Sequence, residues 1–422
     1  MARGCGRTAY PVLMLSAYRP LLRVPGALAF IAGGALARIG GAMFGVSIIV
    51  MVSSRRGSFS LAGAITAVAV LVLAAAGPIL GRLVDRFGQR RIVLPFAVWS
   101  TLCGFATVVL SWTGAPAWTL FLAYGLSAIL PEMGPLSRAR WAHVFAAEPD
   151  TLHTAMSFEQ VMDEASFVLG PVLGIVLSTV WFPEAGLLVA YVLYLVGMVA
   201  FVGARATEPP VVPHHDRPDG YAVARPGMFV VAAVLTMVGV IFGSNEVVAV
   251  AVSKEAGQQS FSSVILALFA LGSTIAGIAF GAKVFRISLS HRLRYAALGM
   301  FLLEAPALFV TDLRGLAVVM LVAGCATAPM LITAMSLSQQ LVPQALVTEG
   351  MAVAVTGILV GISTGAAAGG WAVEHLGPHA GYAVPVAAGL IAVVLSSAFF
   401  GRILRAERAA SAADSEPAVP AS

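Results

Sequence analysis

The feature that most constrains this chain is a series of apolar runs, each about as long as a membrane helix. Twelve such runs are bounded by charged or turn residues, at 26–52, 60–80, 92–110, 117–137, 155–180, 184–203, 227–252, 261–282, 293–311, 315–338, 350–372 and 381–401. A helix needs about 20 mostly apolar residues to cross a bilayer. The pattern therefore predicts an all-α membrane protein with twelve transmembrane helices in two six-helix bundles.

The composition excludes the common soluble classes. Of the 422 residues, 59% are hydrophobic and 11% are charged, whereas roughly 25% are charged in an average soluble protein. The net charge of +5 does not indicate a nucleic-acid partner, because basic residues of membrane proteins gather in cytoplasmic loops. We expect the lipid bilayer to surround this chain and no nucleic acid to bind it.

A polar segment separates the two groups of runs. Residues 204–226 are rich in Pro and charge and lack apolar periodicity, which indicates an exposed linker. The chain is therefore expected to comprise a cytoplasmic N-terminal tail (1–25), an N-terminal six-helix bundle (26–203), a cytoplasmic linker (204–226), a C-terminal six-helix bundle (227–402) and a disordered C-terminal tail (403–422).

The distribution of basic residues predicts the orientation. With the N-terminus inside, twenty of the 25 basic side chains fall in cytoplasmic segments, and Arg38 lies within the first run. Only four fall in outer segments: Arg55, Arg56, Lys254 and Arg314. Because cytoplasmic loops carry the excess of Lys and Arg, we expect a multi-pass protein of the cell inner membrane with both termini in the cytoplasm.

The loop after the second run carries a specific pattern of Gly, Asp and Arg. It reads Gly81-Arg-Leu-Val-Asp85-Arg86-Phe-Gly88-Gln-Arg90-Arg91. Glycine lets the chain leave a helix and reverse, while the Asp and Arg side chains can pair with neighbouring helix ends. This string, in this loop of a six-plus-six chain, resembles the signature loop of the major facilitator superfamily of secondary transporters. The resemblance covers essentially the whole chain through its span count, linker position and orientation.

The resemblance implies parallel halves that rock around one substrate site near the bilayer midplane. A degraded copy of the signature supports this duplication: Gly281 and Arg286 repeat Gly81 and Arg86 after 200 residues, but Phe285 stands where Asp85 would recur. We therefore expect the first copy to carry the ionic gating contacts.

The fifth run contains Gly170, Pro171 and Gly174. These residues resemble part of the motif that marks proton-coupled exporters in the superfamily, although Ser166 replaces an upstream glycine. The alternative is structural, because small residues at every fourth position let helices approach closely.

Charged residues within the runs are candidates for function, because burying a charge in the membrane costs several kcal/mol by most estimates. Arg38 lies near the middle of the first run, and Asp163 and Glu164 lie in the fifth. The superfamily's fold makes these spans neighbours, so we expect Arg38 to pair with one of the two acids and that acid to exchange the coupling proton. Glu159 is expected to be an interfacial acid or part of a static ion pair.

The other polar residues within the runs have different expected roles. Asn245 and Glu246 interrupt the seventh run, where they are expected to contact substrate or to close the outer gate. Arg138 and Arg140 are expected to anchor the membrane interface. Glu304, in a span that is peripheral in the superfamily's fold, is expected to be structural.

Motifs for catalysis or cofactor binding are missing from the sequence. It contains no Walker loop, Rossmann glycine pattern or nucleophile elbow, so we expect neither an enzyme nor a cofactor. His375 and His379 have helical ligand spacing, but Gly377-Pro378 interrupts the helix between them, and we expect no metal site.

The sequence thus predicts a monomeric secondary transporter that exports a small amphiphilic molecule in exchange for protons, by alternating access. Import of a sugar or another nutrient is the alternative, and a membrane receptor or enzyme is a third possibility.

Overall fold

The computed structural model describes residues 18–211, 220–258, 261–283 and 285–415, which form helices and connecting loops with no strand among them. Ten of these helices are long and apolar enough to cross a membrane. They are α3 (Ala27–Arg56), α4 (Phe59–Phe87), α5 (Gln89–Trp112), α8 (Pro149–Val180), α9 (Ala185–Gly203), α10 (Met228–Glu255), α11 (Phe261–Gly281), α13 (Leu313–Gln340), α14 (Val347–Leu376) and α15 (Ala383–Ala398).

The two remaining predicted spans also have helical counterparts. The span predicted at 293–311 is α12 (Leu289–Glu304), which continues as the short 3-10 helix η4 (Ala305–Leu308). The span predicted at 117–137 is divided into α6 (Ala117–Ser127) and α7 (Met133–Val144). All twelve predicted spans are therefore represented in the described residues.

The break between α6 and α7 has a local cause. Pro131 lacks a backbone N–H and disfavours a helical conformation in the residue before it. Side chains supply hydrogen bonds to the backbone carbonyls around the break: Ser100 Oγ donates to Ser127 O (2.6 Å), and Tyr194 Oη donates to Pro131 O (2.9 Å). Irregular backbone at membrane depth persists only where such partners exist.

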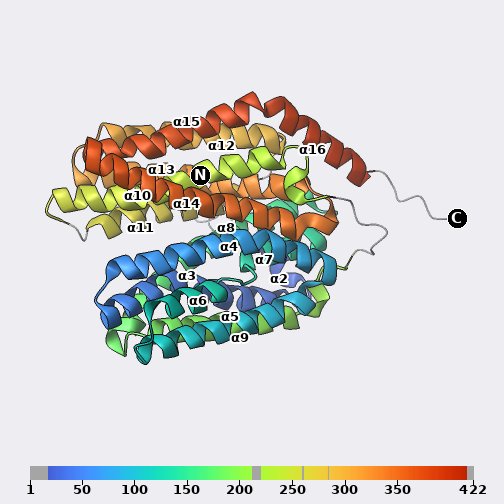
Figure 1. Ribbon diagram of the computed structural model, residues 1–422. Coiled ribbons are helices and arrows are strands. Elements are labelled where there is room, and N and C mark those ends of the chain that lie inside the picture. Colours follow the sequence, from blue (N-terminus) through green and yellow to red (C-terminus); the bar gives the residue numbers. More distant parts are fainter. Residues whose placement is uncertain (1–17, 212–219, 259–260, 284, 416–422) are drawn as a thin grey trace, which may run out of the picture.

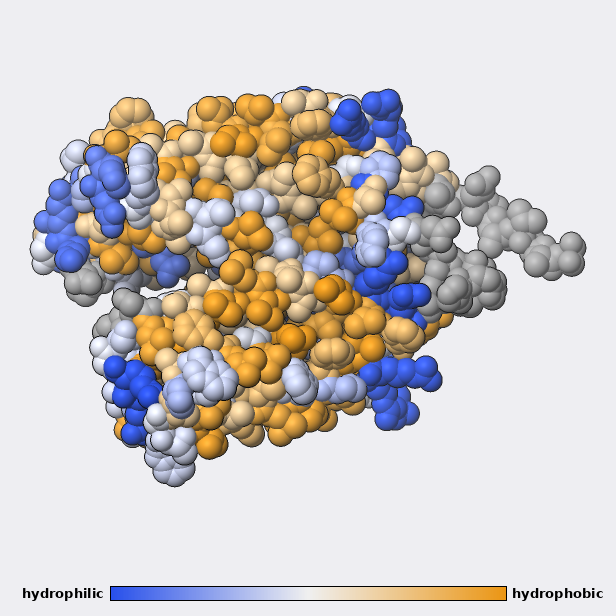
Figure 2. Space-filling model, in the orientation of Figure 1, coloured by the Kyte–Doolittle hydropathy of each residue, from blue (hydrophilic) through white to orange (hydrophobic). Residues whose placement is uncertain are grey.

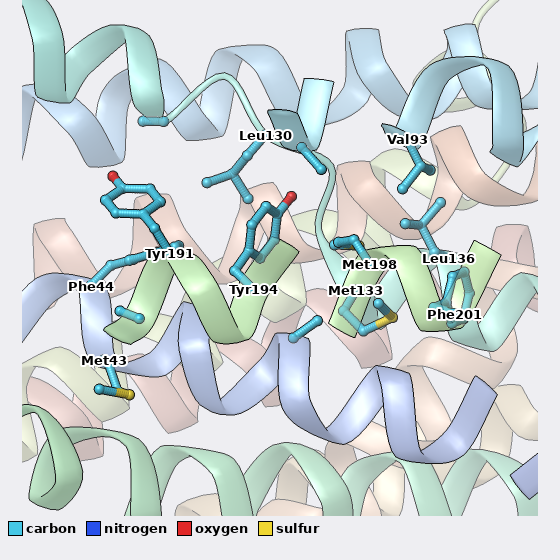
Figure 3. Packing of buried hydrophobic residues seen from close by; sticks show 14 of the residues in the cluster. Met43, Phe44, Val93, Leu130, Met133, Leu136, Tyr191, Tyr194, Met198 and Phe201 are labelled. Carbon is cyan, nitrogen blue, oxygen red and sulfur yellow. The ribbon is translucent and has the colours of Figure 1, made fainter. Parts of the chain in front are cut away.

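Buried aromatic side chains of α9 pack against the segment between α6 and α7. The Tyr191 ring lies 4.4 Å from the Phe44 ring, centroid to centroid, and its hydroxyl donates to Ser127 Oγ (2.6 Å). Figure 3 shows Leu130, from the broken segment, beside Tyr191 and Tyr194. The core of the N-terminal bundle therefore holds the irregular segment in one conformation.

The helices form two bundles that lie against each other, with α3–α9 in one and α10–α15 in the other (Figure 1). The segment between them includes the short 3-10 helices η1 (Arg205–Thr207) and η3 (Ala222–Ala224), at the right in Figure 1. We call this side of the molecule the linker end. The short helix α2 (Arg19–Arg23) lies within the predicted N-terminal tail, whose residues 1–17 are outside the described part.

The prediction of a disordered C-terminal tail is wrong for residues 403–415, because α16 runs from Phe400 to Ser415. Its composition, rich in Ala and Arg, favours a helix. Glu407, which is buried, fixes α16 to the start of α12 by accepting from the backbone N–H groups of Leu289 (2.7 Å) and Ser290 (3.0 Å). A carboxylate at a helix N-terminus satisfies amides that have no intrahelical partner.

Glycines let helices within each bundle approach to backbone contact. A Cβ atom placed on Gly170 of α8 would lie 2.5 Å from Ala42 Cβ and 3.1 Å from Ile39 O of α3, and one on Gly174 would lie 2.8 Å from Ser47 Oγ. Pro171 lies inside α8 between these two contacts. Gly357 of α14 faces the backbone of α10 in the same way.

We expect Gly170→Leu to destabilise the protein, because the backbone of α3 cannot move away from the new side chain. Overpacking of this kind costs about 1–3 kcal/mol. The thermal unfolding midpoint in detergent should fall. Gly63→Leu is the matched control, since a Cβ at Gly63 meets no atom within 4 Å. Equal midpoints for the two variants would contradict close packing at Gly170.

Candidate functional site

A buried network of charged side chains lies in the N-terminal bundle, where α3, α7 and α8 meet. Arg38 of α3 bridges two acids of α8: its Nε lies 2.6 Å from Asp163 Oδ1, and its Nη2 pairs with Glu159. Arg138 Nη2 of α7 lies 2.6 Å from Asp163 Oδ2. Arg38 therefore pairs with Asp163, one of the two acids expected for it, and does not form a salt bridge with Glu164.

Glu159 belongs to the interior of this network. It is 1% exposed, and its Oε1 accepts hydrogen bonds from Ser137 Oγ (2.7 Å) and Trp141 Nε1 (2.6 Å). Of its two expected roles, the static ion pair fits these contacts and the interfacial acid does not. The sequence signal was its spacing of four residues from Asp163, which places both acids on one helix face.

Arg138 and Arg140 do not anchor the membrane interface as expected, because both are buried. Arg140 donates from Nε to Gln89 Oε1 (2.8 Å) and from Nη1 to Ala204 O (2.6 Å), and its guanidinium lies 3.9 Å from the centre of the Phe201 ring. Arg140 therefore joins α7 to the start of the linker, while Arg138 completes the charge network.

Two carboxylates beside the network have no salt bridge to any described residue. Glu164 Oε1 accepts from Gln160 Nε2 (3.1 Å) and from Ser273 Oγ (2.9 Å) of the other bundle. Glu132 precedes α7 at the helix break and faces Gly77 of α4. It lines a small cavity of about 10 Å³ together with residues of α14, enough for about one water.

The Asp85 carboxylate of the signature loop binds the start of a helix in the opposite bundle. It accepts from the backbone N–H groups of Thr348 (3.2 Å) and Glu349 (2.8 Å), in the first turn of α14. A Cβ on Gly81 would lie 2.9 Å from Glu349 Cα, so glycine is needed for this approach. Sequence reasoning found the residue but not its partner, because the partner is backbone.

The rest of the signature loop faces the linker or the surface. The Glu208 carboxylate of the linker accepts a hydrogen bond from the Arg90 backbone N–H (3.0 Å). Gly88 has a φ of 89°, a backbone conformation that favours glycine. Glu349 in turn accepts from the Ala222 N–H of the linker (2.8 Å). The side chains of Arg86, Arg90 and Arg91 are exposed.

The second copy of the signature makes an aromatic contact in place of the ionic one. The Phe285 ring lies 5.7 Å from the His153 ring of α8 and 4.6 Å from the Arg292 guanidinium. Beside it, Gly281 O accepts from Thr154 Oγ1 (3.0 Å). The first copy thus contacts the C-terminal bundle through an acid, and the second copy contacts the N-terminal bundle through an aromatic ring.

Asn245 and Glu246, the substrate candidates of α10, lie in different surroundings. Asn245 is 2% exposed inside the C-terminal bundle, and neither its Oδ1 nor its Nδ2 has a hydrogen-bond partner among the described residues. Its burial places it away from the surface at which substrate would first bind. Glu246 is exposed and remains a candidate. Glu304 is buried in the bundle interior, as a structural role requires.

The hydrogen bonds that join the two bundles, among the described residues, lie between the middle of the helices and the linker end. Tyr18 Oη donates to Ile278 O (3.3 Å), and Thr356 Oγ1 donates to Ala74 O (3.1 Å). Burial raises the pKa of Tyr18 to about 12, so its hydroxyl keeps its proton. We call this interface of α4 and α8 with α14 and α11 the seam. Figure 2 shows a notch between the bundles at the opposite end.

We expect Asp85→Asn to loosen the first turn of α14, because the amide keeps one acceptor oxygen and loses the charge. A hydrogen bond to a charged group contributes about 1.5–3 kcal/mol, so amide hydrogen exchange at Thr348 and Glu349 should accelerate roughly tenfold. Phe285→Leu is the control and should leave these amides unchanged. Unaltered exchange in Asp85→Asn would contradict the capping role.

Comparison with known proteins shows the family of this chain. The model of the Major Facilitator Superfamily matches residues 30–345. No curated protein sequence matches the chain significantly.

Solved structures share the fold at low sequence identity. A bacterial homologue of the iron transporter ferroportin, in an outward-facing state, has a TM-score of 0.72 and 17% identity over 89% of this chain and 99% of its own. The human organic anion transporter MFSD10 (TETRAN) has a TM-score of 0.70 and 15% identity over 89% and 99%. The proton:xylose symporter XylE has a TM-score of 0.64 and 15% identity over 89% and 96%.

These matches confirm the predicted fold class of twelve helices in two bundles and the prediction that the chain is not an enzyme. The chain spans nearly the full length of each of these structures. This multi-pass membrane protein belongs to the Major Facilitator Superfamily of transporters.

Proposed function

We propose that this transporter exports a small amphiphilic compound in exchange for protons, by alternating access to one site between the bundles. The observation that supports proton coupling is an imbalance of charge in the N-terminal bundle, beside the seam. Four carboxylates, those of Glu132, Glu159, Asp163 and Glu164, lie around only two guanidinium groups, those of Arg38 and Arg138.

The contacts of each acid support an assignment of the exchangeable proton. Asp163 uses both oxygens on arginines, and Glu159 is held by Arg38, Ser137 and Trp141. An unpaired ionised carboxylate is costly in the membrane, and binding a proton removes its charge. We therefore assign the exchangeable proton to Glu164, with Glu132 as the second candidate, and assign Arg38 and Asp163 to holding the network together.

The position of Glu164 links its proton to the movement of the bundles. Its hydrogen bond from Ser273 crosses the seam, and a hydrogen bond to an ionised acceptor is roughly twice as strong as one to a neutral acceptor. Protonation therefore weakens a contact that holds the seam together. Loss of the proton restores it.

The direction of transport follows from the predicted orientation. If the linker end is cytoplasmic, the closed seam faces the cytoplasm and Glu164 receives its proton from outside. Release of that proton inside after the seam opens moves protons inward, which suits export of a compound by exchange. Import of a nutrient with protons, as in the proton:xylose symporter of the same fold, is the alternative.

A small, amphiphilic substrate agrees with the sequence, because the spans expected to line the cavity contain few of the Trp, Asn and Gln side chains that suit a sugar. Inside-out vesicles with an acidic interior, screened over a panel of amphiphilic compounds and sugars, test direction and substrate together. Accumulation of an amphiphile supports export. Accumulation only in right-side-out vesicles with protons moving inward would support import.

We expect Glu164→Gln to abolish uphill transport and to spare downhill exchange, because substrate binding persists while the proton-linked step is lost. Uphill flux across a range of pH is the measurement. Glu374→Gln is the control, since Glu374 is exposed at the far end of α14. Normal uphill flux in both Glu164→Gln and Glu132→Gln would refute proton coupling at this site.

A further inference from the structure

The groove beside α16 has the shape and charge of a lipid site. It has a volume of about 660 Å³ and lies between the start of α10, the end of α15 and α16. Its apolar walls include Phe229 and Ala233 of α10 with Leu395 and Phe399 at the end of α15, and Arg402 and Arg405 of α16 stand at its edge. We call it the α16 groove.

The groove lies where the transmembrane helices leave the apolar layer. α10 begins at Met228 and α15 ends at Ala398, so the walls belong to spans and the arginines lie just beyond them. Phe229 is 70% exposed, on the outer surface of the bundle. Figure 1 shows α16 leaving the end of α15 at an angle. Its arginines therefore lie at the depth where lipid headgroups meet acyl chains.

The two arginines are available for an anion. They are three residues apart, on neighbouring positions of one helix face, and both are exposed. Neither forms a salt bridge to a carboxylate of a described residue. Arg405 Nε donates to Gly401 O (3.1 Å) and Arg402 lies 5.4 Å from the Phe399 ring centre, which leaves most of their N–H donors unused.

The groove is held in shape before any ligand binds. Glu407, on the same helix, is committed to the first turn of α12, and Gln340 Nε2 donates to Ser411 Oγ (2.9 Å). A site that is already formed loses less conformational entropy when it is occupied.

We propose that the α16 groove binds an anionic phospholipid. Its phosphate would accept hydrogen bonds from Arg402 and Arg405, because guanidinium groups match phosphate geometry. One acyl chain would lie along Phe229, Ala233 and Leu395, where apolar contact replaces water or disordered lipid. A zwitterionic lipid carries a positive group beside its phosphate and fits this pair of arginines less well.

The test is native mass spectrometry of the full-length purified chain, with phosphatidylglycerol or phosphatidylcholine of identical acyl chains. We expect the wild type to retain phosphatidylglycerol preferentially. Retention should fall at least roughly tenfold in the double variant Arg402→Ala/Arg405→Ala, since each charge-assisted hydrogen bond contributes about 1.5–3 kcal/mol. Ala233→Phe, which fills the groove without changing charge, should weaken retention of both lipids.

Arg408→Ala is the matched control. It removes one charge from the same helix, but Arg408 lines a different hollow beside Ser288 and His291. Retention in this variant should equal that of the wild type, and Arg402→Lys/Arg405→Lys should keep part of the preference. Equal retention of the two lipids by the wild type would overturn the proposal. A loss in Arg408→Ala as large as in the double alanine variant would also overturn it.

Discussion

The structure depends on one constraint: a polar group inside the membrane must find its partner within the protein. The break between α6 and α7 is possible because Ser100 and Tyr194 donate to the carbonyls on either side of it. Arg38 can lie deep in α3 because Glu159 and Asp163 both face it. Glu132 and Glu164 have no salt bridge to a described residue, and for that reason we assign the exchangeable proton to these two acids.

Much of the fold could be predicted from the sequence, because the length of an apolar run is a strong signal in a membrane chain. The charge network was only partly predictable. The depth of Arg38 and the neighbouring positions of the first and fifth spans indicated an acid on the fifth. The spacing of Glu159 and Asp163 indicated that the two acids share a helix face, but not that this face turns toward Arg38, since the orientation of α8 is set by contact with α3 at Gly170 and Gly174.

Other features depend on contacts that a sequence pattern does not encode. The role of Glu407 became visible only when α16 was placed against the first turn of α12. The partner of Asp85 is a pair of backbone amides in the other bundle, and any residues except proline at positions 348 and 349 would supply them. Pro131 was a usable signal for the helix break. It lies within a continuous apolar run, however, and that run predicts one span.

The glycine contacts within each bundle have a consequence for the energetics of the conformational cycle. Where α14 meets α10 and α8 meets α3, backbone lies directly against backbone, so neither pair can slide without steric overlap. Each bundle must then move as a stiff body, and the interactions exchanged during a cycle are confined to the seam. Among the described residues, these interactions include the hydrogen bonds of Asp85, Glu164 and Thr356, and those of Thr154 and His153 with the C-terminal bundle. A ligand that binds between the bundles therefore acts on the relative position of two whole bundles and not on the packing within either.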